Sequence, residues 1–188
     1  RGTNAMPSWS WKGCDGQKAV IEVYSDAASV ALELNGQRTK KLKPKGGKAV
    51  FKLAYQPGTL IAVNYDPDGR AISRSELKTA NNPVLTICPE KKEAKAGEIL
   101  YIPINVQDKH GIVEMNADRQ VNVTVEGGEL LAFGSAAPRT EERYDSGSFS
   151  TYYGRAMAVV RIGSVRQLTV TASDEKEHVR IIIPVKGK

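Results

Sequence analysis

Hydrophobic and polar residues alternate along most of this chain with a period of two. In residues 30–34 every second side chain is a valine or a leucine, and the dipeptide Asn35-Gly36 follows. Alternate side chains of a β-strand point to opposite faces, and Asn-Gly is a favoured two-residue hairpin turn. The pattern predicts a strand with one buried face that ends in a tight hairpin.

The same period recurs about every ten residues through the first part of the chain. Further strands are expected at residues 49–55, 60–65 and 71–77, with turns at 56–58 and 66–69. Glycine, proline and aspartate at these turns are the residues that β-turns favour. No helical periodicity interrupts the series, and short strands at this spacing are typical of a β-sandwich.

A polar segment that ends in proline, residues 79–83, separates this series from a second one. The second series predicts strands at 100–106, 121–125, 168–172 and 179–185. Each half is long enough to bury a small core. We therefore predict an all-β chain of two consecutive antiparallel sandwiches, residues 1–80 and 84–188, joined near Asn81–Pro83.

Residues 134–153 break the alternation. Connections of this length inside compact domains tend to be functional or disordered, and the aromatic content argues against simple disorder. Arginine and aromatic side chains are enriched at interfaces. We expect a contact surface for another domain or a carbohydrate here, made by Arg139, Arg143, Tyr144, Tyr152 and Tyr153, with Phe149 beside them. The alternative is a mobile surface loop, because the segment also contains four serines.

Both tryptophans of the chain, Trp9 and Trp11, lie near its start. Their spacing would put them on the same face of an extended segment. Aromatic faces stack on sugar rings, so a carbohydrate platform is one interpretation. The other is that at least one tryptophan anchors this segment to its own sandwich or to a preceding domain.

The net charge of +6 is concentrated in residues 40–52, which hold six lysines around Gly46-Gly47. We interpret these lysines as a solvated hairpin tip; the alternative is a patch for acidic glycans or nucleic acid. No aromatic residues that would stack on bases are interleaved with the run of lysines, so no nucleic-acid partner is expected. No apolar run approaches the ~20 residues of a membrane span.

Candidate catalytic chemistry is sparse. His110 and His178 are the sole histidines, and nothing near them resembles a nucleophile with its base or a metal-ligand cluster. Glu141 and Glu142 are adjacent, so in an extended loop they point apart and cannot flank one glycosidic bond. Residues 66–69 are explained by a hairpin turn rather than a calcium loop. We expect no catalytic residue, no metal and no cofactor.

The cysteines, Cys14 and Cys88, fall in different predicted domains. We expect two unbridged, partly buried thiols, since buried cysteine behaves as a small hydrophobe. The start of the chain, Arg1-Gly2-Thr3-Asn4, lacks an initiator methionine and any signal-peptide pattern. We interpret it as a position inside a longer chain, whose compartment cannot be deduced from this sequence.

The first half resembles the C-terminal sandwich that follows the catalytic barrel in bacterial family 2 glycoside hydrolases. The resemblance rests on Trp9-Ser10-Trp11 with Gly13 and Gly16, on Val23-Tyr24-Ser25, on residues 30–36, and on residues 55–60 and 62–66 with Gly69. The second half resembles the immunoglobulin-like, invasin-type domain that often comes next. Its cues are residues 102–108 with Gly111, 116–118, 121–125 with Gly127, and 154–161.

Two positions depart from the family pattern. Ser8 stands where a histidine commonly precedes the tryptophans, and residues 135–138 replace a Gly-Asp-Pro type turn. The resemblance implies a fold of two immunoglobulin-like sandwiches. It also implies a parent that is a retaining β-galactosidase with its catalytic glutamates in the barrel, in a bacterial periplasm or secreted. The present chain would then be a non-catalytic accessory region whose partner is the upstream catalytic domain.

Two other functions stay open at this point. One is an independent carbohydrate-binding module that uses Trp9, Trp11 or the aromatics near Tyr144. The other is an adhesin-like spacer, which the invasin-type second half suggests and which predicts tandem copies of that domain. The oligomeric state and the exact sugar cannot be predicted from the sequence.

Overall fold

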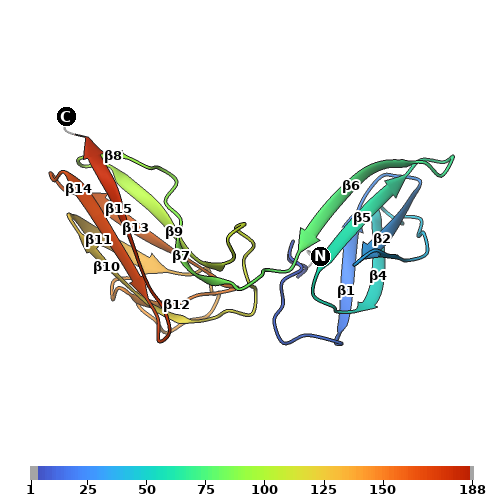
Figure 1. Cartoon of the computed structure of the whole chain (residues 1–188), viewed down its shortest axis with the longest axis horizontal. Helices are drawn as coiled ribbons and strands as arrows, with labels where there is room; N and C mark the ends of the chain where they lie inside the picture. Colours follow the sequence, from blue (N-terminus) through green and yellow to red (C-terminus); the bar gives the residue numbers. More distant parts are fainter. Residues whose placement is uncertain (1–3, 187–188) are drawn as a thin grey trace. The chain divides into compact units, whose positions relative to one another are not determined.

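A computed structural model describes residues 4–186, and every regular element in that range is a β-strand (Figure 1). Arg1–Thr3, on which the interpretation of the chain start rests, lie outside the described residues. The all-β prediction is confirmed. The described chain forms no helix that is long and apolar enough to cross a membrane.

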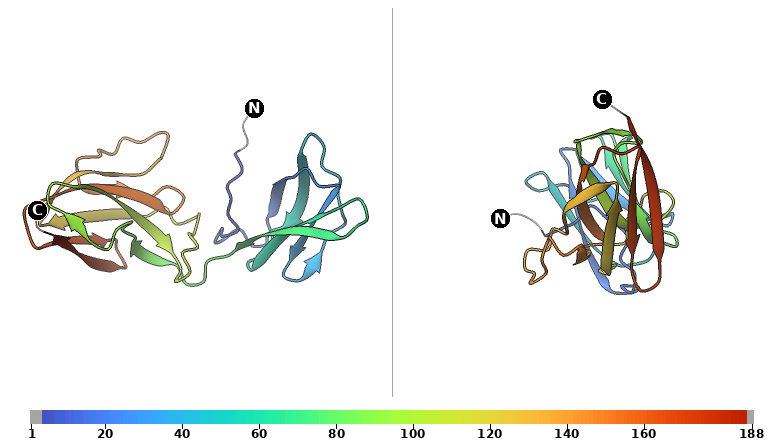
Figure 2. Two further views of the ribbon diagram at one scale, coloured as in Figure 1. Left: turned by 90° about the horizontal axis from the view of Figure 1, so that it is seen from above. Right: turned by 90° about the vertical axis from the view of Figure 1, so that its left-hand side faces the viewer.

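The chain folds as two compact units, one that ends at Thr79 and one that begins at Ala80. Each unit consists of two sheets that pack face to face, the arrangement of a β-sandwich. The left view of Figure 2 shows the strands of each unit from above, turned by 90° from Figure 1.

The first sandwich pairs a two-stranded sheet with a four-stranded one. In the small sheet β1 (Lys18–Tyr24) runs antiparallel to β4 (Lys48–Ala54). The larger sheet has the order β3-β2-β5-β6. Its strands are β2 (Ser29–Leu34), β3 (Gln37–Arg38), β5 (Thr59–Tyr65) and β6 (Ala71–Lys78). The two sheets are therefore unequal in width.

The predicted hairpin turn at Asn35-Gly36 is present between β2 and β3. Both residues have positive φ, 50° for Asn35 and 85° for Gly36, which is the geometry of a type I′ turn. Val30, Leu32 and Leu34 enter the core between the sheets as the alternation predicted, but the other face of β2 is buried as well. The neighbouring side chains Ala31 and Glu33 lie on the opposite face.

The lysine-rich segment is only in part the solvated tip that we expected. Gly46-Gly47 do form a tight turn, closed by Lys45 and Lys48. The preceding residues instead continue along the edge of β2, where Leu42 pairs with Val30. The ammonium of Lys41 lies 3.6 Å from the centre of the Tyr65 ring. A cation over an aromatic face is favourable, so Lys41 helps to cover a second, small core.

The second sandwich is larger. One sheet has the order β11-β13-β9-β7 and the other β12-β10-β14-β15-β8. The first contains β7 (Val84–Ile87), β9 (Ile99–Gln107), β11 (Gly128–Gly134) and β13 (Arg155–Ile162). The second contains β8 (Ala94–Lys95), β10 (Gln120–Glu126), β12 (Ser148–Ser150), β14 (Gln167–Ser173) and β15 (His178–Lys186). This division of strands is that of an immunoglobulin-like domain.

One strand pair departs from the antiparallel prediction. After β7 has paired with β9, the chain crosses to the other sheet, where β8 runs parallel to β15. Before the crossing, β7 is also tied to the other sheet by a hydrogen bond from the Leu85 amide to the Glu177 carboxylate, which also accepts from Arg119. The start of the unit is therefore joined to its last strand.

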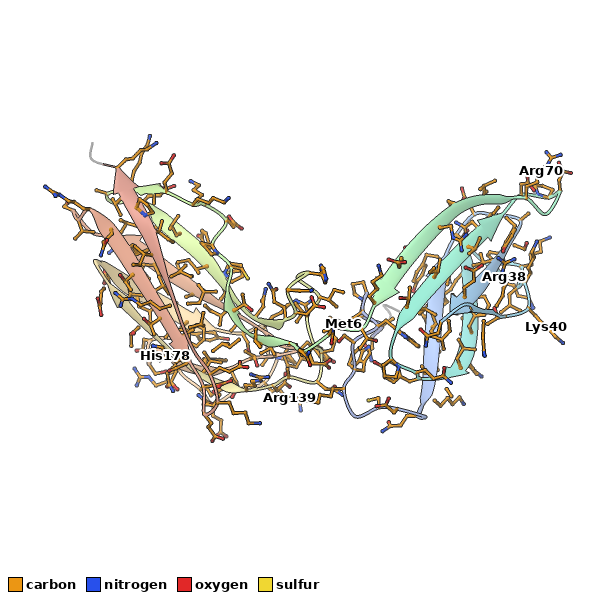
Figure 3. The ribbon with its side chains drawn as sticks, viewed as in Figure 1. Met6, Arg38, Lys40, Arg70, Arg139 and His178 are labelled. Carbon is orange, nitrogen blue, oxygen red and sulfur yellow. The ribbon has the colours of Figure 1, made fainter. Side chains whose placement is uncertain are left out.

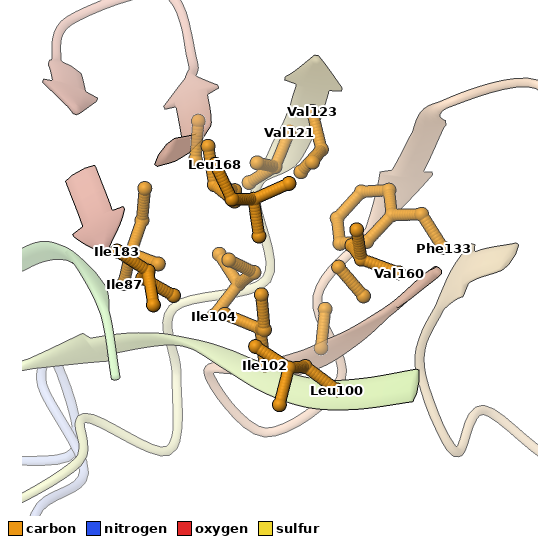
Figure 4. Packing of buried hydrophobic residues seen from close by; sticks show 14 of the residues in the cluster. Ile87, Leu100, Ile102, Ile104, Val121, Val123, Phe133, Val160, Leu168 and Ile183 are labelled. Atoms are coloured by element: carbon orange, nitrogen blue, oxygen red, sulfur yellow. The ribbon is translucent and has the colours of Figure 1, made fainter. Parts of the chain in front are cut away.

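The core of the second sandwich consists of the inward side chains of both sheets (Figure 4). Alternation along β9 places Ile102 and Ile104 at 0% exposure, and Leu168 and Ile183 from the opposite sheet pack with them. Phe133 at the end of β11 is equally buried. A core of this kind holds the strand ends, and hence the loops, in fixed positions.

Candidate functional site

The edge of the first sandwich between β1 and β6 is hollowed by a groove. Within the described residues β1 pairs with β4 alone and β6 with β5 alone, so one edge of each strand faces the groove. One hollow of about 490 Å³ extends from residues 4–9 along β1, and a second of about 260 Å³ continues toward Tyr24. Both are lined by Ile21, Glu22, Leu60, Ser75 and Leu77. The two hollows are therefore parts of one elongated groove.

Strand β6 accounts for the open side of this groove. The strand predicted at residues 71–77 is present, but every residue of β6 except Leu77 is exposed. The two-stranded sheet is too narrow to cover this edge of its partner. Leu77 packs on the core, while Ser73 and Ser75, on the same side of the strand, line the hollows.

Trp9 forms the floor of one end of the groove. It is 4% exposed, and its ring lies 4.9 Å from that of Tyr55. Its indole N–H donates to the carbonyl of Gln56 at 3.0 Å, and its own carbonyl accepts from the Thr79 hydroxyl at 2.6 Å. These contacts are those of a residue that anchors the segment to its own sandwich.

Trp11 lies in the same cluster but is only partly buried. Its backbone N–H donates to the Tyr55 hydroxyl at 3.1 Å, and its indole N–H donates to the carbonyl of Ser8 at 3.3 Å. The first bond holds the backbone of Trp11, and the second orients its ring, which lines the larger hollow. Met6, labelled in Figure 3, belongs to the short segment that lines the same end.

The irregular segment of the second sandwich is more ordered than its sequence suggested. Residues 148–150 form β12, which pairs with β10, and Phe149 is completely buried in the core. The interpretation of Phe149 as part of a contact surface was therefore wrong. A three-residue strand has too little alternation to be recognised in a sequence. The remaining residues, 135–147, project from the sandwich between β11 and β12 (Figure 2).

Tyr144 is the best-positioned aromatic of this projection. Its ring stacks on Phe149, with centres 4.8 Å apart, and lies directly on Gly134, where a Cβ atom would come within 2.2 Å of it. Its carbonyl accepts a hydrogen bond from the Phe133 amide. The side chain nevertheless remains 49% exposed. One face of the ring is thus held in place while the other is accessible to solvent.

The charged residues beside Tyr144 point into solvent. Arg143 pairs with Asp145 through two hydrogen bonds of 2.9 and 2.6 Å. This hydrogen-bonded pairing lowers the pKa of the Asp145 carboxyl and raises the pKa of Arg143. Arg139, labelled in Figure 3, is also exposed. Arg143 and Tyr144 are neighbours on one projection, as an interface would require.

Tyr152 and Tyr153 form a separate pair, with ring centres 4.4 Å apart. The hydrogen bond with Tyr153 raises the pKa of the Tyr152 hydroxyl, and burial acts in the same direction. Tyr153 occupies a tight turn with φ of 50°, and its carbonyl accepts a hydrogen bond from Arg155 at 3.1 Å. This pair belongs to a turn that closes the start of β13, and both side chains are half-buried.

The carboxylates of the projection have structural partners. Glu142 accepts hydrogen bonds from the amide and hydroxyl of Ser150, at 2.8 and 3.0 Å, which fastens the projection to β12. Among residues 4–186 no three His, Cys, Asp or Glu side chains gather as a metal site would require. Cys14 and Cys88 lie in different units, and burial raises the pKa of the Cys88 thiol although a hydrogen bond from Gln107 opposes it.

The groove residues on β5 and β6 were not recognisable in the sequence. Leu60, Ser75 and Leu77 line both hollows together with residues of β1. A serine at an inward position of a strand is a weak signal, because it is equally common on a solvated face. The position becomes informative only when its neighbours across the groove are known.

Family models match both units. A model described as glycoside hydrolase family 2 C-terminal domain 5 matches residues 84–179, just over half of the chain, and one described as a domain of unknown function, DUF4982, matches residues 16–73. These two matches cover one unit each.

Individual relatives match nearly the whole chain. A β-galactosidase of Bacteroides ovatus is 25% identical over 178 residues, which are 90% of this chain and 21% of the relative. The crystal structure of a family 2 glycosyl hydrolase from Bacteroides cellulosilyticus superposes with a TM-score of 0.83 at 28% identity, over 94% of this chain and 25% of the other. A β-glycosidase of Bacteroides vulgatus shares the fold at a TM-score of 0.78 and 22% identity, over 96% and 24% of the two chains. The chain thus spans about a fifth of the length of its curated relative.

Proposed function

Because this chain belongs to the family of glycoside hydrolase family 2 C-terminal domains, we propose that it is the non-catalytic accessory region of a larger β-galactosidase-like enzyme. The observation that carries the proposal is the extent of the match. Both sandwiches align within one β-galactosidase, yet they account for 21% of its length. The catalytic machinery of the proposed parent lies in the remaining part, and the upstream catalytic domain is the expected partner.

The chemistry of the described residues supports an accessory role. A glycosidase needs two carboxyl groups about 5–9.5 Å apart across the scissile bond. Glu142 is engaged by Ser150, and its neighbour Glu141 is an exposed residue of the same projection. A retaining mechanism of the parent and a periplasmic or secreted location stay predictions from the family resemblance.

The first test uses the chain alone. We expect no cleavage of a chromogenic β-galactoside by purified residues 1–188, because the adjacent carboxylates Glu141 and Glu142 are not expected to flank one glycosidic bond. Product release in a continuous absorbance assay is the measurement, and a chain with both Glu141→Gln and Glu142→Gln is its control. Turnover that persists through purification and disappears in the control would contradict the proposal.

The contact role of the projection is tested in the full-length parent. We expect Arg143→Ala with Tyr144→Ala to lower thermal stability or transition-state binding by at least about 1 kcal/mol, the scale of a buried interface anchor. Arg161→Ala is a matched control, because Arg161 is also exposed and ion-paired, with Glu129, but belongs to a regular strand. Equal behaviour of the two variants would make residues 135–147 a passive loop.

A further inference from the structure

The two sandwiches differ in whether two corresponding sheet edges are paired with a further strand. In the second sandwich β9 is the first long strand and β15 is the last strand. In the first sandwich β1 and β6 hold these two places. In the second sandwich β7 pairs with the edge of β9, and β8 pairs with the edge of β15. Within residues 4–79 no strand pairs with the corresponding edges of β1 and β6. The groove therefore occupies the place that added strands fill in the second sandwich.

The side chains at this place show which kind of molecule fits it. The inward side chains of β15, which β8 helps to cover, are apolar: Val179, Ile181, Ile183 and Val185. On β6 the corresponding row changes from Leu77 to the serines at 75 and 73. A peptide strand added to a sandwich buries alternate side chains against an apolar row. The serine row does not offer such a surface.

The groove instead combines an aromatic end with a polar row. Trp11 lines the larger hollow, with its backbone held by the Tyr55 hydroxyl and its ring oriented by the hydrogen bond to Ser8. Ser75 is exposed in the shared part of the groove, and Asn64 and Ser73, joined by a hydrogen bond of 2.9 Å, line the other end. Aromatic rings stack on the apolar faces of sugars, and hydroxyl and amide groups bond their hydroxyls.

The dimensions favour a linear ligand. The hollows together follow β1 from Lys18 to Tyr24, seven residues that span roughly 20 Å as a strand. The larger hollow alone, at about 490 Å³, lies within the ~300–1,000 Å³ of typical ligand sites. A single sugar ring would leave much of this length empty.

We propose that the groove between β1 and β6 binds a linear oligosaccharide, with Trp11 as its stacking platform and Ser75, Ser73 and Asn64 as its hydrogen-bonding row. The choice of a β-galactoside as the first ligand to test rests on the proposed function, while the groove itself requires only an extended saccharide. The site would hold a glycan chain on the accessory region, apart from any catalytic centre.

Tryptophan fluorescence provides a direct measurement, because Trp9 and Trp11 are the two tryptophans of the chain and both line the groove. The chain is titrated with β-1,4-galactotriose, with cellotriose and with maltotriose. We expect a saturable change with galactotriose and a dissociation constant on the order of 1 mM, since an open groove orders its ligand incompletely. Saturation with cellotriose or maltotriose alone would retain the groove as a site and count against the β-galactosidase assignment.

Two variants assign the signal to the groove. Trp11→Ala removes the platform and is expected to weaken binding about tenfold. Ser75→Leu replaces the central hydroxyl by a side chain that packs beside Leu60 and Leu77, so it should preserve or raise thermal stability while it weakens binding at least tenfold. Arg161→Ala, at an exposed strand position of the other unit, is the control and should bind as the unmodified chain does.

Three results would overturn the proposal. The first is no saturable change with any trisaccharide up to about 50 mM, well above the expected constant. The second is unaltered binding by a folded Ser75→Leu variant. The third is a fluorescence change that follows protein concentration, with sedimentation showing a dimer, because a second copy would then occupy the groove. None of these results bears on the activity of the parent enzyme, so failure of the glycan site and failure of the accessory role are separable.

Discussion

Replacing Trp9 by alanine is expected to remove most of the stability of the first sandwich. The side chain is 4% exposed, packs on Tyr55 and donates to Gln56, and both contacts vanish in the variant. Truncation of a buried tryptophan costs about 3–5 kcal/mol. A unit of this size has a total stability of roughly 4–12 kcal/mol. We expect its unfolding midpoint to fall by about 15 °C or more.

Thermal unfolding followed by the fluorescence of the remaining tryptophan isolates the first unit, because Trp11 also belongs to it. Trp11→Ala is the matched comparison: this residue is only partly buried, so a loss of about 1–2 kcal/mol is expected. Equal losses in the two variants would show that Trp9 does not anchor the segment as its burial indicates.

Gly154→Ala is expected to destabilise the second sandwich by about 2–4 kcal/mol. Gly154 has φ of +68°, and a Cβ atom there would lie 2.2 Å from the backbone oxygen of Glu114. Neither problem is relieved by a side-chain movement, because the neighbour is backbone. The measurement is denaturant unfolding of the second unit. The midpoint should fall, while the slope of the unfolding free energy against denaturant concentration stays unchanged.

Gly111→Ala separates the cost of a positive φ from the cost of the close contact with Glu114. Gly111 also has positive φ, +80°, but a Cβ atom would meet nothing within 4 Å. It should therefore show the conformational cost alone, about 1 kcal/mol. If both glycine variants lose the same stability, the close approach of Glu114 to Gly154 has no energetic weight.

The same turn illustrates what could not be predicted from the sequence. Tyr153 and Gly154 form a two-residue turn between Tyr152 and Arg155, and Tyr153 adopts positive φ without being asparagine or glycine. Contacts with Tyr152 and Arg155 hold it there, and these are visible only in the fold. By contrast, Asn35-Gly36 was predictable, because the two residues themselves favour the required geometry.

Alternation was a reliable guide where a strand has one buried face, as in β9 and β10. It does not determine the exposure of β6, which depends on the width of the opposite sheet. It also missed β8 and β12, which are two and three residues long. The groove depends on two tertiary features, one narrow sheet and one uncovered edge strand. Its tryptophans could be identified from the sequence, and its serines could not.

The fastening of β7 and β8 to the last strand has a consequence for synthesis of the chain. The amide of Leu85 finds its carboxylate partner 92 residues later, and β8 has no strand to pair with until β15 is made. Domains rich in such distant pairings fold slowly, and unpaired edges of unfinished sandwiches invite aggregation. On the ribosome the first sandwich can close as soon as β6 emerges, whereas the second stays incomplete until nearly all of its own length has been made.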